Sequence, residues 1–226
     1  MACAVGASLA WWLKPSTIVA QRPVVRAEQP IPARLDYALR WLRGWHDRDL
    51  LERGGVLDTS DFPLADSLRG RFDPLFPDDP DIAAQLAIQE ASDGSDREAQ
   101  AFRSRPFARL TAQPQHAVTQ IASALARDVE RRAAGQMLRL ALAIAQVTGR
   151  SAPLQSLYQT TFTRPTLARE PGSEAVLIAL YGYLRQEPDP SIQRTAVHAA
   201  LSAQPDPAMQ LAMRRTVLLR TDELLF

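Results

Sequence analysis

One segment of the chain is apolar on almost every side of a helix. Residues 137–147 read MLRLALAIAQV, and a helix that is apolar all round has to be covered by other elements. The segment closes the longest helical stretch, 114–148, which begins on a proline and is followed by Gly149, residues that suit the two ends of a helix. We expect Gly135 to break or kink this stretch. The sequence therefore predicts a buried helix at the centre of the core.

The other periodic segments of the chain are helical as well. In residues 33–53, Leu35, Leu39 and Leu42 recur with helical spacing and form one apolar face. Further helices are expected at 81–91, 153–162, 173–185, 190–203 and 207–221, with a partial helix at 98–110, where Pro106 interrupts the pattern. Sustained alternation of β-branched residues occurs nowhere. We therefore predict an all-α fold with almost no sheet, in which residues 33–226 form a single, irregular multi-helix domain.

Residues 56–80 are rich in aspartate, proline and phenylalanine and have neither a helical nor a strand period. We predict a long ordered loop that is held on the helical body by its apolar side chains. These are Phe62, Leu64, Leu68, Phe72, Leu75 and Phe76. A long loop without regular structure is uncommon in a compact domain and often has a function.

The N-terminal segment suggests export. Residues 2–13 are apolar but too short to cross about 30 Å of hydrocarbon, whereas their length suits the core of a signal peptide. Because no basic residue precedes them, a longer membrane anchor with Trp11 and Trp12 at the interface is also compatible. We predict a signal peptide or membrane-anchor segment at 1–20, a tether at 21–32, and a location on the periplasmic side. A cytoplasmic protein with an ordinary N-terminal helix is the alternative.

The tripeptide Pro-Asp-Pro occurs twice, at 188–190 and 205–207, 17 residues apart. An aspartate before a proline leaves the helical region and caps the first free N–H groups of a helix. The proline that follows fits the first helical position, where no N–H is needed. Each motif is therefore expected to end one helix and begin the next, which gives antiparallel helix hairpins.

The stretch DPSIQRTAVHAAL, residues 189–201, resembles the second half of a HEAT-type repeat. In that family a helix opens after an Asp-Pro-like turn and continues with an aliphatic residue, a polar or basic residue and an alanine, here Ile192, Gln193 and Ala196. Gln193 departs from the usual basic residue. The resemblance covers about the last 55 residues, with SEAVLIALYGYL as the partner helix. It implies stacked helix pairs that bind other macromolecules and usually carry no catalysis.

Charge is divided unevenly along the chain, although the formal net charge is +1. Residues 58–96 carry 10 acids and two arginines, and residues 97–169 carry 11 arginines and three acids. We expect the two blocks to face each other within one fold. The alternative is a polyanion-binding surface on the Arg-rich 97–169 segment. The small net charge does not favour a nucleic-acid partner.

Sequence motifs for catalysis or metal binding are absent. The three histidines are far apart, and HExxH, CxxC, GxSxG and Walker-type loops do not occur. Cys3, the only cysteine, lies in the N-terminal apolar stretch, so the folded part can hold no disulfide. The aspartates of 58–81 could offer oxygens to Ca²⁺, but their spacing matches no known loop. We predict no catalytic residue, no metal and no cofactor.

Two groups of residues are candidates for an interaction surface. Tyr37, Trp41 and Trp45 recur at helical spacing and form either a binding stripe or part of the core. Arg127, Arg131 and Arg132 are the basic candidates. We predict a non-catalytic interaction or scaffold protein of a bacterial cell envelope that binds another protein, with possible membrane association through its N-terminal segment. The alternatives are polyanion binding and an enzyme of unrecognised type, with its site under residues 56–80.

Overall fold

The computed structural model describes residues 31–47, 55–93, 98–127, 131–149, 152–163 and 173–223. Among these residues every regular element is helical, and the β-bridge between Leu57 and Ser104 stands alone. The prediction of an all-α fold is confirmed. Ile31–Phe226 forms one compact unit, so the last two residues of the predicted tether, Ile31 and Pro32, belong to the helical body. The predicted signal peptide or anchor and the tether up to residue 30 lie outside the described residues.

Eleven α-helices and two short 3-10 helices follow one another in the described residues. In chain order they are α1 (Ala33–Asp47), η1 (Thr59–Asp61), α2 (Ala65–Phe72), η2 (Asp73–Leu75), α3 (Pro80–Ala91), α4 (Glu98–Ala101), α5 (Arg105–Ala112), α6 (Pro114–Ala126), α7 (Arg131–Thr148), α8 (Ala152–Phe162), α9 (Ser173–Gln186), α10 (Pro190–Ala203) and α11 (Pro207–Glu223).

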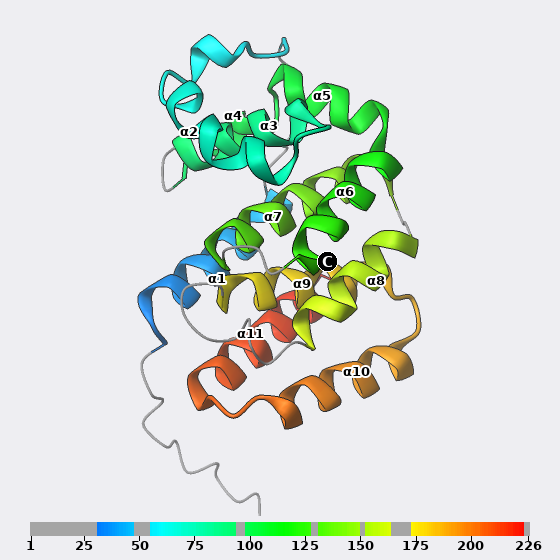
Figure 1. The fold of residues 1–226 in the computed structure, drawn as a ribbon. Helices are drawn as coiled ribbons and strands as arrows, with labels where there is room; N and C mark the ends of the chain where they lie inside the picture. The colour runs from blue at the N-terminus through cyan, green and yellow to red at the C-terminus, as the bar shows by residue number, and fades with distance from the viewer. Residues whose placement is uncertain are drawn as a thin grey trace, which may run out of the picture. The chain divides into compact units, whose positions relative to one another are not determined.

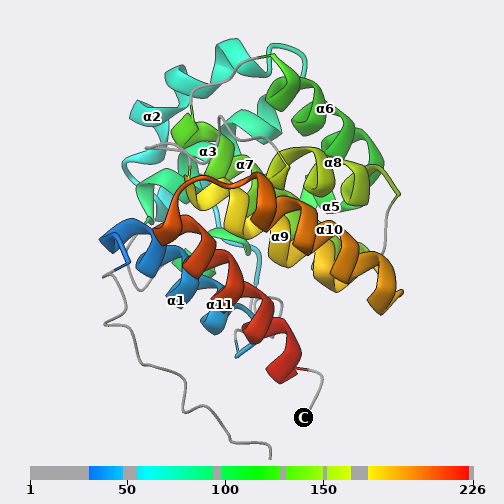
Figure 2. The same cartoon turned by 90° about the horizontal axis from the view of Figure 1, so that it is seen from below.

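Helices α7 and α9 form the centre of the core. All side chains are buried at residues 133–144 of α7 and 175–184 of α9. Helix α9 packs against α7, α8 and α11, and α1 packs against both α9 and α11. Figures 1 and 2 show α1, α9 and α11 side by side. The prediction of a buried central helix is confirmed for residues 137–144, whereas Ala145 and Gln146 are half-buried and Val147 is 41% exposed.

The long stretch 114–148 does not break where the sequence suggested. Helix α6 ends at Ala126 and α7 begins at Arg131, while Gly135 lies buried inside α7. The predicted break at Gly135 is therefore wrong. A Cβ at position 135 would overlap the side chain of Glu174 on α9, so the glycine provides room for a neighbouring helix. Gly149 has a positive φ of 81° directly after α7, as expected of a C-terminal glycine.

Residues 56–80 are ordered, but they are not the predicted loop. They contain α2 and the two 3-10 helices, and α2 packs against α3. Phe62, Phe72 and Phe76 are buried as expected, whereas Leu64 is 61% exposed. The periodic signal was the trio Ala65, Leu68 and Phe72, which share one helical face. An exposed glycine at position 70 and the prolines on either side obscured this short helix.

The two Pro-Asp-Pro corners repeat the same hydrogen bonds. The Asp189 carboxylate accepts from the Ser191 N–H at 2.7 Å, and the Asp206 carboxylate accepts from the Ala208 N–H at 2.9 Å. Gln193 Nε2 donates to the carbonyls of Leu184 and Glu187 at 3.1 and 2.6 Å. Gln210 Nε2 donates likewise to the carbonyls of Leu201 and Gln204, at 3.3 and 2.6 Å. Each glutamine therefore ties the start of one helix to the end of the helix before it.

These corners reverse the direction of the chain. Helices α9, α10 and α11 begin at Ser173, Pro190 and Pro207, which are 17 residues apart. In both views the three helices run in alternating directions (Figures 1 and 2). The prediction that each motif ends one helix and begins the next is confirmed.

Replacing Gln193 or Gln210 by alanine is expected to lower the free energy of unfolding by about 1–2 kcal/mol for each substitution, because two hydrogen bonds to helix-end carbonyls are lost. Urea denaturation followed by circular dichroism measures the change. Gln159→Ala on the exposed face of α8 is the matched control and should change the stability little. Equal losses at positions 159 and 193 would show that the corner bonds contribute nothing.

Candidate functional site

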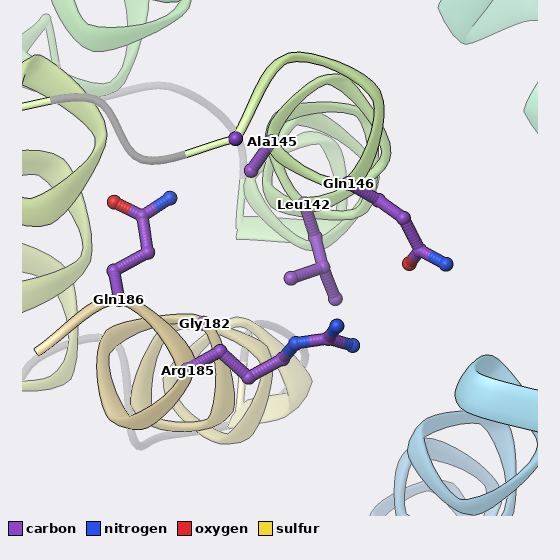
Figure 3. Close-up of a pocket in the computed structure, with 7 residues that line it drawn as sticks. Leu142, Ala145, Gln146, Gly182, Arg185 and Gln186 are labelled. Atoms are coloured by element: carbon purple, nitrogen blue, oxygen red, sulfur yellow. The ribbon is translucent and has the colours of Figure 1, made fainter. Parts of the chain in front are cut away.

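A pocket lies between the C-terminal parts of α7 and α9. It has a volume of about 210 Å³. Helix α7 and the residue after it contribute Leu142, Ala145, Gln146 and Gly149, and α9 contributes Gly182, Arg185 and Gln186. The spacing of three or four residues places each set on one helical face. Figure 3 shows Gln186 on one side of Leu142 and the Gln146 amide on the other, with the Arg185 guanidinium below the tip of Leu142.

Several polar atoms of this pocket are buried without a hydrogen-bond partner in the described structure. They are Gln146 Oε1, Arg185 Nη1, and both Oε1 and Nε2 of Gln186. The Gln186 residue is only 7% exposed, so bulk water does not solvate its amide. An unsatisfied buried polar group costs about 1–3 kcal/mol. The pocket is therefore a place where a bound molecule can supply the missing hydrogen bonds.

Tyr158 of α8 lies against the α9 wall of the pocket. An ideal Cβ at Gly182 would be 2.6 Å from Cζ of Tyr158, so the ring rests directly on the glycine. The Tyr158 hydroxyl is buried and unpartnered as well. Burial raises the pKa of this hydroxyl, against the opposing effect of the nearby Arg185 charge. The hydroxyl therefore stays protonated and neutral beside the guanidinium.

Gly182→Ala is expected to destabilise the protein by about 1–3 kcal/mol, because the added methyl group overlaps the buried Tyr158 ring. Gly70→Ala in α2 is the matched control, since a Cβ there meets nothing within 4 Å. That substitution should instead stabilise the helix by about 0.5–1 kcal/mol. Chemical denaturation of both variants tests the contrast. A stabilising Gly182→Ala would mean that the ring of Tyr158 does not rest on α9.

The predicted aromatic stripe belongs mainly to a buried ionic cluster. Trp41 is buried, so an interaction surface at this residue is a wrong prediction, and the core alternative holds. Trp41 packs against Arg139 of α7, whose guanidinium lies over the indole ring at 5.8 Å. The same guanidinium pairs with Asp93 at 2.8 Å and with Glu98 at 3.3 Å. The side chain of Trp45 lies outside the described residues.

Tyr37 joins this cluster through its hydroxyl, which lies 2.9 Å from Asp93 Oδ1 and 3.1 Å from Glu98 Oε2 and donates its single proton to one of these carboxylates at a time. Burial and the two carboxylates raise the pKa of Tyr37. Burial lowers the pKa of the Arg139 guanidinium, but the surrounding carboxylates outweigh burial and hold this pKa above its usual value. The neutral phenol and the charged guanidinium thus offer hydrogen bonds to the buried carboxylate of Glu98 and to the exposed carboxylate of Asp93.

The predicted arginine group is only partly described. Arg127 is exposed, and its Nη2 donates to the Leu75 carbonyl at 3.0 Å. Arg131 and Arg132 begin α7, but their side chains lie outside the described residues. Other arginines of 97–169 pair with acids of 58–96, as expected for blocks that face each other. These pairs are Arg105–Asp58, Arg109–Asp81 and Arg139–Asp93.

A second cavity, of about 360 Å³, adjoins the end of residues 56–80. His116 Nε2 lies 3.3 Å from the carboxylate of Asp79, and Arg109 Nε donates to Asp81 at 2.7 Å. Asp79 also caps α3 by accepting from the Ile82 N–H at 3.3 Å, so this acid has a structural task. Within the described ranges, His, Cys, Asp and Glu side chains nowhere gather in threes as a metal site needs.

Sequence reasoning missed the pocket between α7 and α9. The available signal was the placement of Gln146, Arg185 and Gln186 directly after the long apolar runs of two helices.

None of the described helices combines the length and apolar character needed to cross a membrane.

Comparison with known proteins found no matching family, no matching curated protein and no matching solved structure.

Proposed function

We propose that the chain is a non-catalytic interaction protein that binds another protein through the outer face of α10. The observation that carries the proposal is the exposure of this helix. Among its 14 residues only Ala200 is buried, and Ile192 is 48% exposed. A solvent-facing aliphatic side chain on an ordered helix provides apolar area for a partner without requiring the helix to fold on binding.

The way α10 is attached supports this proposal. Ala196, Val197 and Leu201 are half-buried against the core, and a glutamine-closed corner holds each end of the helix. The outer face then presents Ile192, Arg194, Thr195 and His198. A rigid helix with an apolar residue among polar ones is a common docking element. The HEAT-like grouping of α9, α10 and α11 is part of the proposal, as is an envelope location based on residues 1–20.

Site-specific crosslinking in cells tests this assignment. A photoreactive amino acid at position 192 is expected to give a discrete crosslinked product, because the partner lies on α10. Position 64 is the matched control, since Leu64 is also a large exposed aliphatic residue, on a different part of the fold. No discrete product at 192, or the same product at both positions, would contradict the proposal.

One specific observation supports each of the two alternative functions, polyanion binding and catalysis. Arg127 is exposed, so its guanidinium is accessible to a polyanion. Polyanion binding predicts that the protein is retained on heparin at low salt and that added salt weakens this retention steeply.

The cavity with His116 and Asp79 is the place where an enzyme would act near residues 56–80. His116→Ala would abolish activity in that case, whereas crosslinking at position 192 would be unaffected.

A further inference from the structure

Among the described residues that line the pocket between α7 and α9, Arg185 carries a positive charge and none is an acid. Its guanidinium lies over the ring of Tyr181 at 5.8 Å, and none of the described carboxylates pairs with it. A guanidinium offers a planar pair of N–H donors that matches a carboxylate. The Arg185 end of the pocket is therefore suited to an anionic group.

The other end of the pocket has different chemistry. Gln186 presents an unpartnered N–H₂ donor and an unpartnered carbonyl acceptor together, and it is more than nine-tenths buried. A primary amide complements both at once, because it also offers an N–H₂ donor group and a carbonyl acceptor. An ammonium group would add a second positive charge near Arg185, where none of the described lining residues is an acid. The Gln186 end is therefore suited to a neutral amide.

The middle of the pocket is apolar. Leu142 and Ala145 lie on the α7 side, and Figure 3 places Leu142 between Gln186 and the amide of Gln146. The volume of about 210 Å³ corresponds to roughly seven water molecules of the liquid. This space accommodates a short aliphatic chain with a polar group at each end.

From these features we infer that the pocket binds a short-chain carboxylate with a primary amide at its other end. Arg185 binds the carboxylate, and Gln186 pairs with the amide. The methylene groups of the ligand cover Leu142 and Ala145. This inference is independent of the protein partner proposed for α10.

Three five-carbon probes separate the two ends of the ligand. Glutaramate carries both groups, valerate carries only the carboxylate, and valeramide carries only the amide. Each is titrated into the purified protein at constant ionic strength, and the side-chain amide resonances of Gln146 and Gln186 are followed by NMR. Glutaramate is expected to bind about tenfold more tightly than either of the other two probes, since each lost hydrogen-bonding group leaves the pocket unsatisfied.

Two variants assign the ends. Arg185→Gln is expected to weaken glutaramate binding about tenfold or more, whereas Arg214→Gln, which removes an exposed arginine of α11, leaves it unchanged. Gln186→Leu is expected to abolish the preference for glutaramate over valerate while valerate still binds. The thermal midpoint of each variant without ligand verifies folding.

Three results would overturn the inference. They are the absence of any shift of the Gln146 and Gln186 resonances at millimolar probe, a glutaramate preference that survives Gln186→Leu, and an affinity unchanged by Arg185→Gln. The first result would mean that the pocket holds only water.

Discussion

Replacing Arg139 by methionine is expected to lower the free energy of unfolding by about 3–5 kcal/mol. Arg139 is 3% exposed and pairs with the carboxylates of Asp93 and Glu98. Methionine retains much of the side-chain volume but removes the cation that pairs with Glu98, which is also buried. A buried carboxylate that loses its partner keeps the cost of desolvation without the attraction that offset it. Urea denaturation of the variant measures this loss.

The control substitution removes an exposed arginine in place of the buried one. Arg214→Met on α11 is expected to change the stability by about 0.5 kcal/mol or less, because surface substitutions away from special features have small effects. If the two substitutions cost the same, the buried cluster of Arg139 does not stabilise the fold.

Phe72→Ala is expected to have an effect of similar size and to lower the free energy of unfolding by about 3–5 kcal/mol. Phe72 is fully buried at the end of α2, where it joins the core beneath residues 56–80. Without the ring a cavity remains, and we expect the 56–80 segment to open first. Limited proteolysis should therefore cut the variant within this segment under conditions in which the original protein is resistant.

Asp78→Ala is the control for charge in the same segment. Asp78 is exposed, and exposed ion pairs contribute only about 0–1 kcal/mol. Its proteolysis pattern should match that of the original protein. If Asp78→Ala opened the segment and Phe72→Ala did not, electrostatics rather than apolar burial would hold it.

The all-α class could be predicted because most of the longer helices have their own local signal. The all-round apolar pattern of 137–147 requires a buried helix, and each Pro-Asp-Pro fixes one helix start through residues only a few positions away. Helix α2 could not be recognised in this way, because it has eight residues and contains Gly70. The break predicted at Gly135 was wrong because this glycine does not end the helix. Its lack of a side chain instead leaves room for Glu174 of the neighbouring helix.

The candidate site could not be predicted, because it arises from the pairing of two helices. Gln146 and Gln186 lie on different helices, and no local pattern states that α7 and α9 lie against each other. Trp41 shows the same limitation. Its helical spacing with Tyr37 is compatible with a surface stripe or with the core, and the position of Arg139 on α7 decides between them.

The corners between α9, α10 and α11 have a consequence for the order of folding. Their hydrogen bonds join residues two to nine positions apart. The cluster around Arg139 joins residues 41 to 61 positions apart. Closing a longer chain segment costs more entropy before any contact is gained, so local structure forms faster. The C-terminal helices are therefore expected to form early, and the N-terminal helices to be joined to the buried arginine late.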